Sequence, residues 1–243
     1  MTTPLDPTSQ FDSISIDLSK EGLPSIEPED PIALDQQATR HKVQAARAGS
    51  FTQLALASLD LRNCEHEILI QPGWQDSGAT HWQTLWQKQL GFEKIEHADW
   101  DTPTCKEWMQ TIANSLVGKK SPIIVAHSLG CIAVVQAISR GLIKPTAVIL
   151  VAPADMDRNI HNVTATGFTP IPTTPLACPA LVIASTDDKY MTSDRSAVFA
   201  KMWEADFKLL PGHGHINAAS NIGDWVDGQR LVYRFLFEQG LLK

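Results

Sequence analysis

The sequence lacks paired cysteines, long apolar runs and a surplus of positive charge, and each absence excludes a class of protein. The four cysteines, Cys64, Cys105, Cys131 and Cys178, form no Cys-x-x-Cys pair, which argues against a zinc ribbon or a dithiol redox motif. No apolar run approaches the roughly 18 residues of a membrane helix. The polar first residues do not resemble a signal peptide. We therefore expect a cytoplasmic protein with free thiols and no membrane segment.

Acidic residues are concentrated near the N-terminus. Residues 1–35 carry eight acidic side chains and one basic one, whereas residues 36–243 have no net charge. That balance gives no basic field for nucleic acid, so no nucleic-acid partner is expected. We interpret residues 1–60 as an acidic, proline-rich extension, irregular and then helical, and residues 61–243 as one domain. The extension is a candidate contact for a protein partner or a lid over a site.

Short apolar runs alternate with helix-like segments from residue 67 onward. Strands are predicted at 68–71, 94–97, 123–126, 147–151, 180–185 and 206–210, and helices at 76–90, 104–117, 131–138, 193–203 and 225–239. This alternation predicts an α/β fold of three layers, a compact and mostly parallel sheet with helices on both faces. The loop at 152–179 is short for a large cap domain, so we expect an open site.

A sharp turn joins a predicted strand to a predicted helix in residues 121–137, SPIIVAHSLGCIAVVQA. Ser128 stands at its apex in the pattern of a nucleophile elbow, Gly-x-Ser-x-Gly, with Ala126 at the first small position. A hydroxyl placed there lies beside the first N–H groups of the helix, where negative charge is favoured. The pattern indicates a nucleophilic serine. The alternative is an ordinary turn with a surface serine.

Two later strands end in the residues that would activate such a serine. Asp187 and Asp188 follow one strand and His215 follows the next, which is the chain order of a Ser-Asp-His triad in this type of fold. The carboxyl ends of parallel strands meet at one edge, so these side chains should converge. His215 is the expected base, and either aspartate could orient it. His213 and His215 have no third ligand nearby in sequence, so we expect neither a metal nor a cofactor.

Two backbone N–H groups are candidates for an oxyanion hole. Leu129 directly follows the serine, and Trp74 lies in the loop after the first strand. Loss of one such donor typically costs about 3 kcal/mol of transition-state stabilisation. We interpret His81 and Trp82 as packing residues and expect His127 to point away from the site.

Residues 67–239 resemble the small serine hydrolases of the retinoblastoma-binding-protein-nine type, a family of α/β-hydrolases. The matching stretches are QPGWQDSGATHWQTLW (71–86), DWDTP (99–103), VAHSLGC (125–131), LVAPAD (150–155), PALVIASTDDKY (179–190) and LPGHGHINAASNIGDW (210–225). The resemblance implies that Ser128 and His215 are catalytic. In the family the acid directly precedes a Pro-aromatic pair. Here Lys189-Tyr190 takes that place, which implies Asp188 as the acid.

Two functions follow from this reading. The first is a serine hydrolase that cleaves a small ester or amide through an acyl-enzyme intermediate. The second is a protein-binding module on a hydrolase fold, with the acidic extension contacting the partner, because a fold does not fix a function. The sequence indicates neither the physiological substrate nor the oligomeric state.

Overall fold

The computed structural model describes residues 61–158 and 164–242. The predicted acidic extension, residues 1–60, lies outside the described residues. Its helices and its two candidate roles therefore stay predictions.

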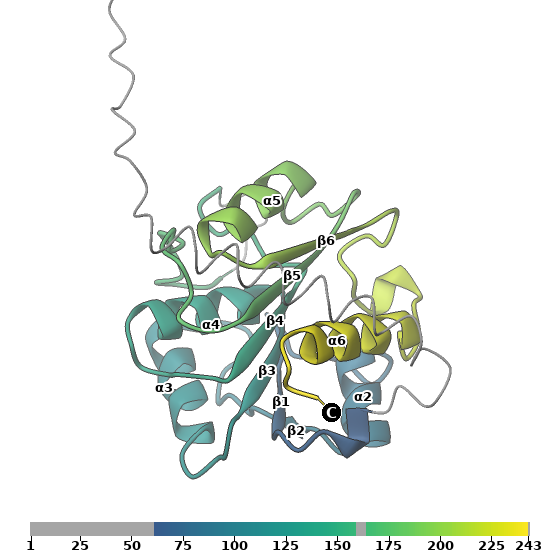
Figure 1. Cartoon of the computed structure of the whole chain (residues 1–243). Coiled ribbons are helices and arrows are strands. Elements are labelled where there is room, and N and C mark those ends of the chain that lie inside the picture. The colour runs from purple at the N-terminus through teal and green to yellow at the C-terminus, as the bar shows by residue number, and fades with distance from the viewer. Residues whose placement is uncertain (1–60, 159–163, 243) are drawn as a thin grey trace, which may run out of the picture. The chain divides into compact units, whose positions relative to one another are not determined.

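Six strands form one parallel sheet in the order β2-β1-β3-β4-β5-β6 (Figure 1). The strands are β1 (Ile68–Gln71), β2 (Glu93–Lys94), β3 (Ile123–His127), β4 (Ala147–Val151), β5 (Ala180–Ser185) and β6 (Asp206–Leu210). The four central strands are buried along their whole length. The predicted parallel sheet is confirmed, and its β-branched apolar runs have the composition of strands buried on both faces.

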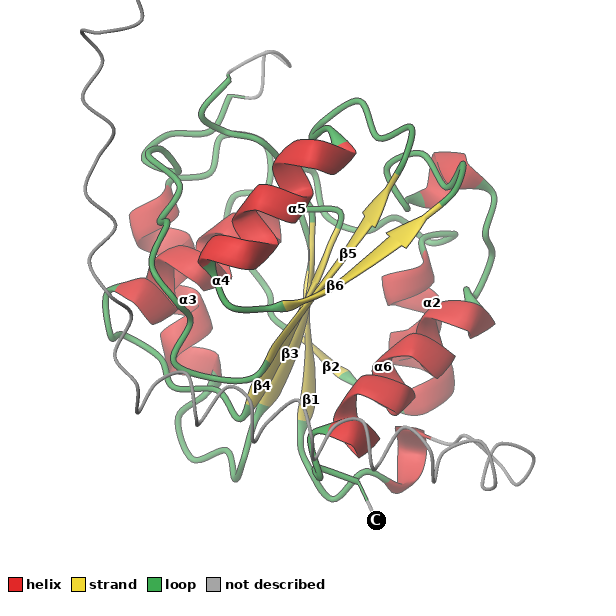
Figure 2. Ribbon diagram, turned by 45° about the horizontal axis from the view of Figure 1, so that its top comes forward, coloured by secondary structure: helices red, strands yellow, loops and turns green. Residues whose placement is uncertain are grey.

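Helices cover both faces of this sheet (Figure 2). One face carries α2 (Trp82–Leu90) and α6 (Val226–Glu238), and the other carries three helices: α3 (Cys105–Ser115), α4 (Leu129–Ser139) and α5 (Ser193–Met202). Two short 3-10 helices complete the described elements, η1 (Leu61–Asn63) and η2 (Ala218–Ser220). No helix among the described residues has the length and apolarity to cross a membrane.

Alternation along the strands separates the core into two clusters. Leu69 and Ile124 pack with α3, α4 and α5, whereas their neighbours Ile70 and Val125 pack on the other side of the sheet. That second cluster holds three mutually contacting tryptophans, Trp82, Trp86 and Trp225. The predicted packing role of Trp82 is thus confirmed. The four cysteines are unpaired, as predicted.

Two predicted boundaries on the N-terminal side of the sheet are wrong. The helix predicted at 76–90 begins at Trp82, because Gln75 and Asp76 take left-handed backbone angles, φ 63° and 62°, that a helix does not allow. The strand predicted at 94–97 is only Glu93–Lys94. The longer loop before α2 places residues 73–81 along the carboxyl edge of the sheet, where the candidate site lies.

Candidate active site

Ser128 sits at a strained turn between β3 and α4. Its φ of 54° and ψ of −124° lie in a region that residues other than glycine rarely occupy. The turn is held on both sides, since Ser128 N–H donates to Val151 O at 3.0 Å and Ser128 O accepts from Cys131 N–H at 3.0 Å. The backbone geometry of a nucleophile elbow is therefore present where the sequence predicts it.

Small residues let the loop after β1 approach this turn. A Cβ added to Gly130 would lie 2.2 Å from the carbonyl oxygen of Pro72, and one added to Gly73 would lie 2.8 Å from Ser128 Cβ. Ala126, fully buried and paired with Gln71, fills the first small position of the pattern. This close packing brings the backbone of the β1 loop beside the serine.

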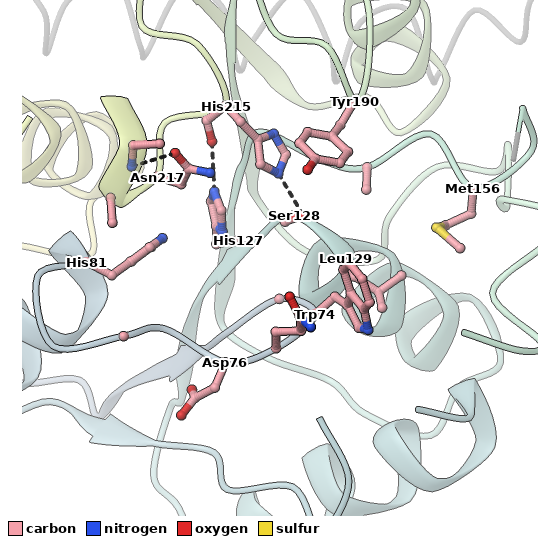
Figure 3. Close-up of a pocket in the computed structure, with 16 residues that line it drawn as sticks. Trp74, Asp76, His81, His127, Ser128, Leu129, Met156, Tyr190, His215 and Asn217 are labelled. Atoms are coloured by element: carbon pink, nitrogen blue, oxygen red, sulfur yellow. Dashed lines mark hydrogen bonds between the residues drawn. The ribbon is translucent and has the colours of Figure 1, made fainter. Parts of the chain in front are cut away.

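Ser128, His215 and Asp188 form a continuous hydrogen-bonded chain. His215 Nε2 lies 2.8 Å from Ser128 Oγ, and His215 Nδ1 lies 2.8 Å and 3.0 Å from the two carboxylate oxygens of Asp188. The carboxylate can only accept, so Nδ1 carries the proton and Nε2 is free to accept from the serine hydroxyl. The ring of Tyr190 lies 4.2 Å from the imidazole of His215. The backbone N–H of Tyr190 donates to the carboxylate of Asp188 at 2.8 Å. Figure 3 shows His215 above Ser128 with Tyr190 beside it.

Asp187 has a different set of partners. It accepts from Ser185 Oγ–H at 2.7 Å and from Gly214 N–H at 2.8 Å. These hydrogen bonds, that of Ser185 first, lower the pKa of Asp187 below its usual value. Asp187 thus ties the end of β5 to the loop that carries His215. Of the two aspartates left open by their positions, the structure brings Asp188 to the imidazole.

Trp74 and Leu129 carry the two backbone N–H groups that the sequence offers for an oxyanion hole. Both residues line the same cleft as Ser128. The neighbouring Gln75 and Asp76 N–H groups donate to backbone carbonyls, whereas no backbone acceptor within the described residues receives the N–H of Trp74 or Leu129. The indole of Trp74 is anchored elsewhere, donating to Asp101 O at 2.8 Å. This is the arrangement that an oxyanion hole requires.

Two further histidines line the cleft. The prediction that His127 points away from the site is wrong. Its ring lines the cleft, and its Nε2–H donates to His215 O at 2.9 Å. Burial, and then the neighbouring His81 and His215, lower the pKa of His127 well below its usual value. Burial likewise lowers the pKa of His81 to about 4. Both rings are therefore uncharged at neutral pH. The sequence held one signal for a place in the cleft: His127 directly precedes the predicted nucleophile, and His81 lies at the end of the β1 loop.

The cleft has a volume of about 390 Å³ and two unlike sides. Figure 3 shows Trp74, Leu129 and Met156 on one side of Ser128, and His81 and Asn217 on the other. None of the described residues that line it is a lysine or an arginine. Within residues 61–158 and 164–242, no three His, Cys, Asp or Glu side chains are grouped to hold a metal. The described lining of the cleft therefore has an apolar side and a polar side.

Comparisons with known proteins bear on the family and the fold of this chain. A family model described as serine hydrolase matches residues 68–234. No curated protein matches the sequence. Among solved structures, a YdeN-like hydrolase of Pectobacterium atrosepticum is 25% identical, with a TM-score of 0.65 over 82% of this chain and 99% of that one.

Two more solved structures show the fold. The ydeN gene product of B. subtilis is 18% identical, with a TM-score of 0.54 over 70% of this chain and 97% of that one. Est1E from Butyrivibrio proteoclasticus is 15% identical, with a TM-score of 0.56 over 74% and 92%. With the parallel sheet and its two helix layers, these likenesses establish the compact α/β-hydrolase fold.

Proposed function

The chain belongs to the serine hydrolase family, and on that premise we propose that it cleaves a small ester or amide bond through an acyl-enzyme intermediate. One observation carries the proposal. Asp188, His215 and Ser128 form an unbroken hydrogen-bonded chain that ends at the floor of the cleft. A serine hydroxyl is a weak nucleophile until a positioned base takes its proton.

The proposed reaction has two halves. His215 Nε2 takes the proton from Ser128 Oγ as the oxygen attacks the substrate carbonyl carbon, and Asp188 holds the imidazolium that forms. The N–H groups of Leu129 and Trp74 stabilise the negative carbonyl oxygen. His215 then gives its proton to the leaving alcohol or amine, whose bond to the carbonyl carbon breaks. A water molecule, deprotonated by His215, then attacks the acyl carbon. The bond from that carbon to Ser128 Oγ breaks, His215 returns its proton to Oγ, and the acid is released.

We further infer that the chain is of the retinoblastoma-binding-protein-nine type and acts as a carboxylesterase. Two of the sequence stretches that carry the resemblance line the cleft from opposite ends of the domain sequence: 71–86 supplies the loop of Trp74 and the start of α2 at His81, and 210–225 supplies the loop of His215 and Asn217. The likeness to Est1E supports this choice at the level of fold alone. The four free thiols support the cytoplasmic location that the sequence predicts.

A fluorophosphonate probe, which reacts with activated serines, tests the proposal against the protein-binding alternative. We expect the full-length chain to be labelled and the Ser128→Ala variant to stay unlabelled. Cleavage of nitrophenyl acetate should follow the same pattern. Equal labelling of both proteins, or none of either, would contradict the enzyme proposal. The second outcome would leave the binding module as the better account.

A further inference from the structure

His81 is a buried side chain of the cleft that the proposed triad does not use. It is 5% exposed and is the N-cap of α2, where its Nδ1 accepts from Gln83 N–H at 3.2 Å. A ring nitrogen that accepts a hydrogen bond carries no proton, so in the neutral ring the proton is on Nε2. The cap therefore fixes which nitrogen of His81 is a donor.

The ring of His81 packs against two neighbouring aromatic rings. It lies 4.9 Å from the ring of His127 and 5.5 Å from that of Trp82. No acceptor among the described residues hydrogen-bonds to Nε2 of His81. This nitrogen is also not among the fully buried polar atoms that lack a partner, so it keeps some exposure. Because His81 lines the cleft, its N–H is open to whatever fills it. Figure 3 shows the imidazole extending toward His127, across the cleft from Met156.

The surroundings of His81 narrow the kind of group that it can bind. With a pKa of about 4, the ring is an uncharged donor at neutral pH. The carboxylate near it, Asp76, is paired with Lys94 at 2.9 Å, and no lysine or arginine is among the described residues that line the cleft. An anionic substrate would find no counter-charge there. A purely apolar substrate would leave the buried N–H unpaired, which is unfavourable.

We propose that His81 is a specificity-determining residue whose Nε2–H donates a hydrogen bond to an uncharged oxygen of the substrate, apart from the oxygen of the scissile carbonyl. The oxygen would belong to a carbonyl, ether or hydroxyl group. The short apolar part of the same substrate then lies along Met156 and Leu129, on the other side of Ser128. This inference rests on the proposed hydrolase function and adds a substrate class to it.

Two pairs of esters that exchange one methylene for an ether oxygen test the inference. One pair changes the acyl part, nitrophenyl methoxyacetate against nitrophenyl butyrate. The other changes the alcohol part, methoxyethyl acetate against butyl acetate. The measured quantity is the ether-to-alkyl ratio of kcat/KM, compared between the wild type and His81→Asn so that intrinsic reactivity cancels. Asparagine also caps helices well, and its shorter side chain withdraws the donor from the cleft.

We expect the ratio in one of the two pairs to fall about tenfold in His81→Asn, the value of one neutral hydrogen bond. The matched control is Thr104→Asn, which exchanges the N-cap of α3 outside the cleft and should keep the wild-type ratio. If His81→Asn does not fold, His81→Ser provides another capping residue without the donor.

The outcomes separate the two proposals. If both ratios are the same in the wild type and in the His81 variant while the probe still labels Ser128, the role of His81 is overturned and the hydrolase function stands. If the wild type neither reacts with the probe nor cleaves any of the four esters, the hydrolase function is overturned and the role of His81 with it.

Discussion

Asp187 and Asp188 are adjacent carboxylates with separate tasks. Asp188 holds Nδ1 of His215, whereas Asp187 holds the backbone of the loop through Gly214 N–H. Replacing Asp188 by asparagine should present an amide to the imidazole and favour the wrong tautomer. We expect kcat to fall about 10³- to 10⁴-fold in Asp188→Asn, by analogy with the triad aspartate of other serine hydrolases. Nitrophenyl acetate hydrolysis measures it.

The neighbouring substitution provides the control for that measurement. Asp187→Asn keeps an oxygen that can accept from Ser185 and Gly214, so we expect a loss of less than about tenfold, since the imidazole keeps its partner. A larger loss in Asp187→Asn than in Asp188→Asn would contradict the assignment of the two carboxylates.

The sequence predicts most of the residues of this site and leaves others unrecognised. Ser128 follows from a turn pattern and His215 from its place in the chain order, and both can be recognised in the sequence alone. The choice between Asp187 and Asp188 depends on the direction of two neighbouring side chains, which the loop geometry decides and the spacing does not. The resemblance, and not the spacing, favoured Asp188. The sequence predicts a packing role for His81, because no sequence pattern at a helix start distinguishes a capping histidine from one that lines a cleft.

At the scale of elements, the elbow depends on backbone contact between the β1 loop and α4. In Gly130→Ala the new methyl group would meet Pro72 O at 2.2 Å, a backbone atom that cannot move aside alone. Overpacking of this kind costs about 1–3 kcal/mol or more. We expect the melting temperature to drop by about 5 °C or more, and ester hydrolysis to fall with it, because the turn would open.

Gly78→Ala is the matched control for that change. Gly78 lies in the β1 loop, which Gly130 contacts at Pro72, and nothing stands within 4 Å of a Cβ added to Gly78. Its melting temperature should stay within about 2 °C of the wild type. Similar melting temperatures for Gly130→Ala and the wild type would contradict the close approach at the elbow.

A buried ion pair ties the loop after β4 to α5. The side chain of Asp155 is only 1% exposed and forms an ion pair with Arg195, without the geometry of a hydrogen bond. Asp155 N–H also donates to Tyr190 O at 3.0 Å. The loop carries Met156, which lines the cleft. The pair therefore supports the apolar side of the candidate site from behind.

Removing the Arg195 side chain should leave the buried carboxylate of Asp155 with only the more exposed Arg158 beside it. We expect Arg195→Ala to lower the free energy of unfolding by about 3 kcal/mol, as for other broken buried pairs. Urea denaturation measures it. Arg158→Ala is the control, because Arg158 contacts the same carboxylate from a side chain that is 52% exposed and should cost less than about 1 kcal/mol. Equal losses in the two variants would contradict a buried, supporting role for Arg195.

The elements themselves were predictable to different degrees. Strands β1, β4, β5 and β6 have the predicted bounds, because each is a short run with turn residues or a polar residue at its ends. The start of α2 was not predicted. Its tryptophans have a helical spacing that continues back to Asp76 in the sequence. The left-handed angles at Gln75 and Asp76 accompany a hydrogen bond from Gln75 N–H to the carbonyl oxygen of Trp100, which is distant in sequence.

For the molecule as a whole, the modest cleft predicts short substrates. Its volume is about 390 Å³, and its apolar side is formed by Trp74, Leu129 and Met156. Each buried methylene contributes about 0.8 kcal/mol, but only while it stays inside the cleft. We expect kcat/KM for nitrophenyl esters to be highest at acetate to butyrate and to fall by octanoate. Ser128→Ala corrects for background hydrolysis, and a maximum at laurate would contradict the prediction.

Three buried histidines should make the folded domain sensitive to mild acid. Burial lowers the pKa of His81 and His97 to about 4 and that of His127 further. An unfolded chain takes up these protons near pH 6.5, whereas the folded chain resists them. Between those values the unfolded state binds more protons, so stability is fully present above about pH 6.5 and is lost as the pH falls toward 4.

We therefore expect the free energy of unfolding to fall between pH 7.5 and pH 5, with His97 contributing about 2 kcal/mol of that loss. His97 is suited to the test because it stacks on Trp108 and contacts Gln71 at 3.0 Å, outside the triad. The glutamine of His97→Gln does not titrate in this range, since an amide has no such pKa, and the loss of stability of this variant between the two pH values should be about 2 kcal/mol smaller than that of the wild type. Urea denaturation at both pH values gives the two differences, and any constant cost of the substitution cancels between them. The same pH dependence in both proteins would mean that His97 takes up its proton in the folded state as readily as in the unfolded one, which its burial beside Trp108 argues against.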